Sequence, residues 1–342
     1  MTVMVLLVAI TIGGGCYMLD YSLAPDPTRE NTDSCYRQLF TDYPETREWM
    51  DSLRTNHALR DTMMTMPAGY RLHVYHIDKG CQRTALVVHG WRDQAIKFFY
   101  LARMYERLLG YNVVMPDLYA SGQSEGEMLR MGWQDRLDVL QLMDAFKADT
   151  MVVHGVSMGG ATTMMASGER MPDGIRDLRF VDDCGYTGVW DEFAGQLKSE
   201  FGLPAFPLMY TTSWICQLRY GWNFNQASAL RQVAKCRYPM FFIHGDEDAF
   251  VPTWMVYELY DAKPEPKVLW VTRKTDHAHS YKNYRKEYVE RISRFLKEWG
   301  RTTCLIGAAG RGCPISFRNG PRYQSCRQTY SDDSECAAWR NC

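Results

Sequence analysis

One stretch of the chain, residues 149–169, constrains the fold more than any other. It begins with an apolar run at 151–153 that is typical of a short buried strand. The pattern Gly-x-Ser-x-Gly follows over residues 155–159, with Ser157 at its centre, and a helix-compatible segment rich in Ala and Met comes next. Strand, tight turn and helix in this order expose the hydroxyl above a helix N-terminus, while the glycines leave room for close packing. Taken alone, the pattern also fits a serine that only caps a helix.

Short apolar runs alternate with helical patterns between residues 68 and 300. Besides the run before Ser157, the runs that we expect to form strands occupy residues 70–77, 85–88, 111–115, 178–181, 240–243 and 268–271. The helical patterns occupy residues 95–109, 133–146 and 280–299. This alternation indicates an α/β protein with a mostly parallel sheet and helices on both faces. Reactive groups then gather at the carboxyl ends of the strands.

Two loops that follow expected strands contain the groups that a nucleophilic serine needs. A serine hydroxyl is too weak an acid to react unaided, so an imidazole has to take its proton and a carboxylate has to orient the imidazole. The loop at 244–252 offers three carboxylates, and the loop at 272–280 offers two histidines. The candidates are Asp246, Glu247, Asp248, His277 and His279. Three signals in the order serine, carboxylate, histidine favour a catalytic serine over a helix cap.

Five motifs extend this interpretation over residues 68–300: VVHGW, MPDLYASGQSEG, GVSMGG, FIHGDEDAFVP and DHAHSY. With them the chain resembles the α/β-hydrolase superfamily, and it is most similar to the branch of serine aminopeptidases and monoacylglycerol-lipase-like enzymes. The resemblance implies an α/β-hydrolase fold with a helical cap. It also implies that Ser157 is the nucleophile, Asp248 the acid and His277 the base.

The resemblance gives the neighbouring candidates lesser roles. Asp246 is expected in the turn that precedes the acid, and Glu247 is expected to be solvated. His277 begins a segment similar to the H-x-x-S pattern of the family, which favours it as the base. His279 lies two residues further on and remains the alternative base.

The negative charge of a tetrahedral intermediate requires two backbone N–H donors. The residue after the nucleophile, Met158, is expected to supply one, and Trp91 in the loop after the strand at 85–88 is expected to supply the other. We interpret His89 as a structural residue that bonds this loop. Asp117 and the turn at 122–124 resemble an architectural loop of the family.

Residues 186–235 interrupt the core between two expected strands, where hydrolases of this family commonly carry a lid. Ten of these 50 residues are aromatic, against 13% in the whole chain, and Pro204 and Pro207 separate the helices. This composition suits a cap over an apolar acyl pocket, although each single aromatic residue more simply packs the cap onto the core. Three cysteines are expected to be buried small apolar residues: Cys184, Cys216 and Cys236.

The two ends of the chain differ from its centre. Residues 1–19 are apolar and uncharged, which predicts a signal sequence or membrane anchor, with a buried N-terminal strand or helix as the alternative. Residues 20–67 are expected to be a packing segment, irregular at first and weakly helical from 44 to 66. Residues 301–342 hold five of the 11 cysteines and are expected to be a disordered tail, or a tail cross-linked by disulfides.

The sequence therefore predicts a serine hydrolase that cleaves an ester, thioester or amide through an acyl-enzyme. Its substrate is a small acyl compound, and the aromatic cap favours esters of apolar acyl groups. A serine peptidase or aminopeptidase, an acyltransferase and a non-catalytic binding protein of the same fold are the alternatives. No metal or organic cofactor is required. A net charge of −1 does not suggest that the chain binds nucleic acid. The expected location is anchored in a membrane or exported to a bacterial-type envelope, with the cytoplasm as the alternative.

Overall fold

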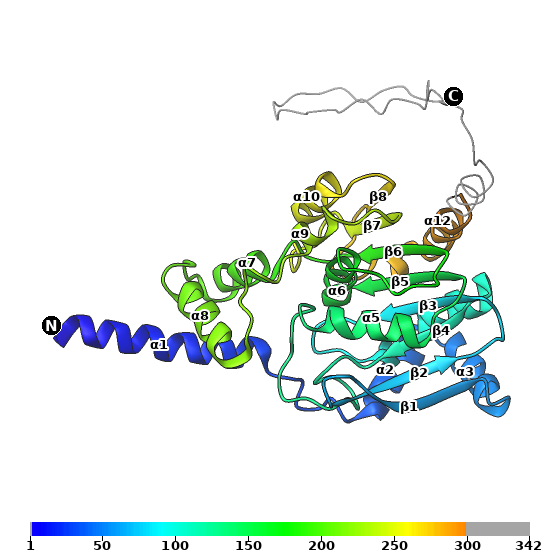
Figure 1. Cartoon of the computed structure of the whole chain (residues 1–342), viewed down its shortest axis with the longest axis horizontal. Coiled ribbons are helices and arrows are strands. Elements are labelled where there is room, and N and C mark those ends of the chain that lie inside the picture. Colours follow the sequence, from blue (N-terminus) through cyan, green and yellow to red (C-terminus); the bar gives the residue numbers. More distant parts are fainter. Residues whose placement is uncertain (1, 299–342) are drawn as a thin grey trace, which may run out of the picture.

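The computed structural model describes residues 2–298, whose strands form one mixed sheet (Figure 1). Within these residues the sheet has eight strands in the order β1-β2-β4-β3-β5-β6-β7-β8. The strands are β1 (Leu59–Thr65), β2 (Arg71–Ile77), β3 (Arg83–Val88), β4 (Asn112–Pro116), β5 (Thr150–Val156), β6 (Asp177–Asp183), β7 (Met240–Gly245) and β8 (Lys267–Thr272). Strands β3 to β8 are mutually parallel, while β2 runs antiparallel to both β1 and β4. The predicted mostly parallel sheet is confirmed.

Helices cover both faces of this sheet, and alternate side chains of each central strand pack on opposite layers. On β5, Met151 and Val153 join one apolar cluster, and Val152 joins the other. The first cluster holds α5 and α6, the second holds α2 and α3, and the two pairs lie on opposite faces of the sheet (Figure 1). The first α-helices are α1 (Thr2–Leu23), α2 (Thr32–Asp42), α3 (Glu45–Thr55), α4 (Phe99–Arg103), α5 (Asp135–Ala145) and α6 (Met158–Ser167). Those that follow are α7 (Val189–Phe201), α8 (Leu208–Tyr220), α9 (Ala229–Val233), α10 (Trp254–Ala262), α11 (Ser280–Asn283) and α12 (Arg285–Glu298).

The strands expected between residues 70 and 271 are all present, but two expected helices are less regular than predicted. Residues 95–109 form three pieces: a 3₁₀ turn (Ala95–Phe98), α4, and a π-helical turn (Met104–Leu109) that ends at Gly110 with φ 73°. The expected helix at 280–299 is divided at Tyr284 into α11 and α12.

The segment before residue 68 contains more regular structure than the sequence predicted. Its first part, expected to be irregular, forms α2, and the weak helix expected over 44–66 is correct only for α3. From Leu59 the chain forms β1 instead, which pairs with β2 from Leu59 opposite Ile77 to Thr65 opposite Arg71. Most side chains of β1 are exposed, so backbone pairing at the sheet edge decides its conformation and no apolar alternation marks it. The sheet therefore begins at β1, nine residues before the expected start at residue 68.

The N-terminal helix α1 extends away from the sheet and packs along α8 of the cap (Figure 1). Gly15 allows the two helices to approach, because a Cβ at this position would lie 3.0 Å from a side-chain carbon of Thr211. At its C-terminal end, Leu19 and Leu23 are buried in the core. The helix thus runs beyond the expected boundary at residue 19, and its last turns form part of the fold. Among the helices of the described residues, none is long and apolar enough to span a bilayer.

The cap predicted over 186–235 is helical and consists of α7, α8 and α9. The break between α7 and α8 contains Pro204 and Pro207, as expected. The tail predicted over 301–342 lies outside the described residues.

Candidate active site

Ser157 occupies a sharp turn between β5 and α6. Its φ of 57° and ψ of −121° lie in a region that residues with a Cβ rarely adopt. The turn is held by the backbone N–H of Ser157, which donates to the carbonyl oxygen of Asp183 at 2.8 Å. The flanking glycines are sterically required: a Cβ on Gly155 would lie 1.9 Å from the carbonyl oxygen of Gly159, and one on Gly159 would lie 2.1 Å from that of Val88. The expected close approach of strand and helix is confirmed.

The loops after β7 and β8 bring a carboxylate and an imidazole to this serine. His277 Nε2 lies 2.8 Å from Ser157 Oγ, and His277 Nδ1 lies 2.7 Å from Asp248 Oδ2. When Nδ1–H donates to the carboxylate, Nε2 is left to accept the serine hydroxyl proton. The structure thus joins the three predicted residues in one chain of hydrogen bonds.

Asp248 is held more firmly than its neighbours in the acidic loop. Its Oδ1 accepts the backbone N–H groups of Phe250 at 3.0 Å and Val251 at 2.8 Å. Burial acts to raise the pKa of Asp248, but the hydrogen bonds from His244 and His277 outweigh it and lower the pKa to about 2. This carboxylate therefore stays ionised at any ordinary working pH.

The alternative candidates lie outside this chain of hydrogen bonds. Asp246 is exposed and accepts the backbone N–H of Thr275 at 3.3 Å, which fits its predicted place in the turn. Glu247 is exposed, as expected. His279 is exposed at the N-terminal end of α11. His277 and Asp248 are thus the histidine and the aspartate that lie in the chain of hydrogen bonds to the serine. His279 and Asp246 lie outside it.

The two expected oxyanion donors lie beside the serine. Met158 is the first residue of α6, and Trp91 lines the same cavity as Ser157. The loop before Trp91 passes close to Ser157, because a Cβ on Gly90 would lie 3.4 Å from the Cβ of Ser157. The role of the two backbone N–H groups stays a prediction.

His89 has the structural role that we predicted for it. Its Nδ1 lies 2.8 Å from the carbonyl oxygen of Gly90, and its Nε2 accepts the backbone N–H of Leu118 at 2.8 Å. The imidazole thus ties the loop that carries Trp91 to the chain that follows β4. Both ring nitrogens are engaged, so the side chain is not free to exchange protons with a substrate.

Asp117 is architectural, as the sequence indicated. Its carboxylate is buried and accepts the backbone N–H groups of Ala95 at 2.8 Å and Gln123 at 3.1 Å. The same carboxylate lies 3.0 Å from Nδ1 of His73. Gly122 is required beside it, since a Cβ there would lie 2.3 Å from the carboxyl group.

A cavity of about 60 Å³ lies in front of Ser157, between the core, the cap and the end of α1. Of the ten aromatic residues of the cap segment, Tyr186 and Phe193 line it, and Tyr21 and Phe250 from other segments do so too. Other cap aromatics such as Trp222 are fully buried in the core. A cavity with aromatic walls is thus present, as expected. The packing interpretation is correct for Trp222 and Phe224, whereas Phe201, Phe206, Tyr210 and Trp214 are exposed.

Sequence reasoning missed three buried groups near the site. His244 in the motif FIHGDEDAFVP is buried, and its Nε2 lies 3.4 Å from Asp248 Oδ2. Asp182 at the end of β6 is buried, and burial raises its pKa to about 7. Glu192 of α7 lines the cavity, and burial raises its pKa to about 8. The motif contained the signal for His244, whereas nothing local in the sequence marked Glu192.

The described residues contain one group of three potential metal ligands, Cys184, Asp248 and His277. Burial raises the pKa of the Cys184 thiol well above its ordinary value, so the thiol stays protonated and is a poor ligand. The other two side chains already bond one another. The arrangement fits hydrogen bonding better than metal binding. Cys184, Cys216 and Cys236 are buried, as predicted.

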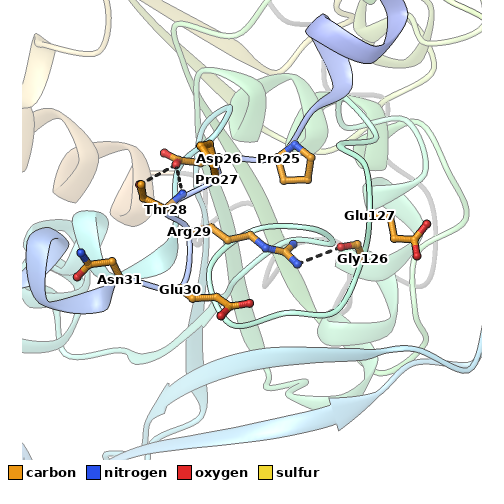
Figure 2. A pocket seen from close by; sticks show the side chains of 9 residues that line it. All are labelled: Pro25, Asp26, Pro27, Thr28, Arg29, Glu30, Asn31, Gly126 and Glu127. Atoms are coloured by element: carbon orange, nitrogen blue, oxygen red, sulfur yellow. Dashed lines mark hydrogen bonds between the residues drawn. The ribbon is translucent and has the colours of Figure 1, made fainter.

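A second cavity of about 720 Å³ is open to the surface and lies over the segment between α1 and α2 (Figure 2). Residues 25–31 line it together with Gly126 and Glu127. Arg29 donates from Nη2 to the carbonyl oxygen of Gly126 at 3.1 Å, and Asp26 accepts from Thr28. These bonds hold the segment against the core, and no residue of the Ser157 chain of hydrogen bonds reaches this cavity.

The strained serine after β5, the strand order and the two polar loops together define an α/β hydrolase. A family model described as the alpha/beta hydrolase family matches residues 85–304, and the chain belongs to that family. The predicted superfamily and fold are confirmed. The narrower placement in the serine aminopeptidase and monoacylglycerol-lipase-like branch stays a prediction.

Individual proteins are similar to this chain in sequence or in structure. The Bacillus subtilis (strain 168) protein YqkD is 27% identical over 267 residues, which cover 76% of this chain and 87% of YqkD. A solved structure of the Pyrococcus furiosus esterase Pf2001 matches with a TM-score of 0.56 and 25% identity, over 70% of this chain and 92% of the esterase. The bromoperoxidase of Bacillus anthracis matches in fold, with a TM-score of 0.52 and 17% identity over 70% of this chain and all of that one.

Proposed function

We propose that the protein is a serine esterase that works through an acyl-enzyme. His277 takes the proton of the Ser157 hydroxyl while Ser157 Oγ attacks the ester carbonyl carbon. The Asp248 carboxylate stabilises the imidazolium that forms on His277. The backbone N–H groups of Met158 and Trp91 stabilise the oxyanion. His277 then protonates the leaving alcohol, and a water molecule hydrolyses the acyl-enzyme by the same steps.

The observation that carries this proposal is the pair of short contacts on either side of His277. Distances of 2.8 Å to Ser157 Oγ and 2.7 Å to Asp248 Oδ2 are hydrogen-bonding distances for a nucleophile, its base and the group that orients the base. They occur at a serine with strained backbone angles. Such strain is commonly stored at functional sites.

Esters of apolar acyl groups are the substrates that the site suits best. The cavity beside Ser157 has aromatic walls, including Trp91 and Phe193, and an adjoining cavity of about 40 Å³ continues along α7 and α8. The structurally similar Pyrococcus furiosus protein is an esterase, which agrees with this choice. A peptidase or an acyltransferase would use the same three side chains on another substrate, and a non-catalytic binding protein would leave them unreactive.

We further propose that the enzyme acts at a lipid surface. Large apolar side chains of α1 are exposed, with Met4, Leu6 and Ile10 each about 60% exposed or more. The cap helix α8, which packs on α1, exposes Trp214 and Leu218 to a similar degree. Exposed apolar side chains of this size on two packed helices favour contact with lipid.

Labelling with a fluorophosphonate probe tests the proposal, because only an activated serine reacts with it. We expect labelling of the full chain, none of the Ser157→Ala variant, and slow labelling of His277→Ala. A matched control is Ser199→Ala, which changes an exposed serine of α7 and should leave labelling unchanged. If the full chain is folded but is not labelled, the protein is instead the non-catalytic binding protein. A panel of p-nitrophenyl esters of increasing acyl length then identifies the preferred acyl group.

A further inference from the structure

Glu192 is a buried carboxyl group with one unused oxygen in the wall of the cavity beside Ser157. It lies on α7 of the cap, and only 4% of its surface is exposed. Its Oε1 accepts from Gln196 Nε2 at 3.1 Å, whereas Oε2 has no hydrogen-bond partner within the described chain. Leaving a buried carboxyl oxygen without a partner costs free energy, so the group requires an explanation.

The charges around this carboxyl group leave it uncompensated. A second carboxyl group, that of Glu200, lines the same cavity, and the described residues that line it include neither Lys nor Arg. Burial raises the pKa of Glu192 to about 8, the hydrogen bond from Gln196 opposes the shift, and the Asp248 carboxylate adds to it. A cation placed beside Glu192 would favour its ionised form, and none of the described residues that line the cavity supplies one.

Most of the remaining wall of the cavity is apolar or aromatic. Phe193 and Trp91 contribute aromatic rings, and Phe193 also lines the adjoining cavity that extends along the cap. Aromatic faces attract cations as well as apolar groups. A molecule that fits both features has an apolar stem and one positively charged end.

We propose that Glu192 binds a protonated amine of the substrate, so that the preferred substrates combine an apolar stem with a basic nitrogen. This inference rests on the proposed use of the cavity beside Ser157 as the substrate site. The amine donates an N–H to the unused Oε2, and its charge stabilises the ionised form of Glu192. The apolar stem then occupies the aromatic part of the cavity, with the scissile carbonyl toward Ser157.

Binding of n-hexylammonium and 1-hexanol to the Ser157→Ala protein tests the amine site without turnover. The two probes have the same apolar chain and differ in their polar end. We expect the amine to bind about tenfold more tightly than the alcohol by titration calorimetry, as an added charge-assisted hydrogen bond predicts. Equal affinities would overturn the proposal, and this comparison needs no change at Glu192.

A second substitution in the Ser157→Ala protein tests whether Glu192 causes the preference for the amine over the alcohol. Glu192→Gln keeps the shape and removes the charge, so it should reduce the preference for the amine to less than about twofold. The matched control Glu200→Gln removes an exposed carboxylate of the same cavity and should retain most of the preference. An unchanged preference in folded Glu192→Gln protein would overturn the assignment. If the full chain fails to label with fluorophosphonate while the amine preference persists, the esterase proposal fails and the amine site stands.

Discussion

Arg92 donates from Nη2 to the carbonyl oxygen of Tyr21 across 2.7 Å, and from Nε to that of Ala24 across 3.0 Å. A guanidinium at the C-terminal end of α1 satisfies carbonyl oxygens that the helix leaves free and complements its dipole. Arg92 directly follows Trp91, whose indole N–H also reaches α1, at the carbonyl oxygen of Ser22 across 3.3 Å. The loop expected to stabilise the oxyanion is thus fixed to the N-terminal helix.

The first prediction concerns this connection. Arg92→Ala should lower kcat/KM for a p-nitrophenyl ester about tenfold, because the loop that carries Trp91 loses two charge-assisted hydrogen bonds. Arg92→Lys should recover part of the loss. Arg170→Ala is the control, since Arg170 is highly exposed and its ion pair with Asp173, at 3.8 Å, lies on the surface. Full activity in a folded Arg92→Ala protein would show that α1 does not support the site.

The second prediction separates the two histidines. His277→Ala should reduce kcat on the order of 10⁴-fold, because it removes the base of the proposed reaction. His279→Ala should change kcat by less than about threefold, because His279 is exposed and the effect of a surface substitution is small. Steady-state kinetics on one ester measures both. The reverse ranking would assign the base to His279.

The third prediction separates two aspartates of one loop. Asp248→Asn should reduce kcat on the order of 10⁴-fold by misorienting His277. Asp246→Asn should have a small effect on kcat and lower the melting temperature slightly, because Asp246 is exposed and accepts the backbone N–H of Thr275 in the turn. Since the pKa of Asp248 is about 2, its titration should not appear in the pH–rate profile above about pH 4. Equal losses in the two variants would contradict the assignment.

Much of the fold and of the proposed site could be predicted because the signals were local. The run before Ser157, the glycines around it and the polar loops after β7 and β8 each depend on neighbouring residues. Parallel strands bring their carboxyl ends to one edge, so chain order sufficed to gather Ser157, Asp248 and His277.

The features that could not be predicted depend on distant partners. Strand β1 exists because its backbone pairs with β2, and its exposed side chains carry no alternating pattern. The position of Glu192 in the cavity depends on how α7 lies over the core, which its own sequence does not specify. The contact of α1 with the loop after β3 depends on Arg92, 68 residues from Ala24.

The fourth prediction concerns the proposed lipid contact. Replacing Ile10 and Trp214 with Ser in one variant removes two large exposed apolar side chains, one from each helix. Binding to phosphatidylcholine vesicles, measured by co-sedimentation, should fall at least about tenfold, and activity on a water-soluble ester should stay within about twofold. Leu137→Ser is the control, because this exposed leucine lies on α5, outside α1 and the cap. Equal vesicle binding in the double variant and the full chain would contradict the proposal.

The last prediction uses Asp182, which is buried beside the proposed site. Its Oδ1 accepts the backbone N–H of Gly185 at 3.0 Å, and Oδ2 has no hydrogen-bond partner among residues 2–298. Burial and the nearby Asp183 raise its pKa, which His244 and the Gly185 bond oppose, and the result is about 7 against an ordinary 3.8. Between these values the folded chain holds a proton that the unfolded chain has released.

The contribution of Asp182 to the free energy of unfolding should therefore fall as the pH rises from 4 to 8, because at this site the folded state binds more protons than the unfolded state. Asp182→Asn keeps an acceptor for the Gly185 N–H and removes the titration. Its stability relative to the unmodified chain should thus increase by roughly 4 kcal/mol over this range, as a shift of about three pKa units implies. Urea unfolding at several pH values measures the difference. The control Asp173→Asn, at an exposed surface position, should have the same free energy of unfolding as the unmodified chain at every pH. If the curves of unfolding free energy against pH were parallel for Asp182→Asn and the unmodified chain, Asp182 would be ionised in the folded protein.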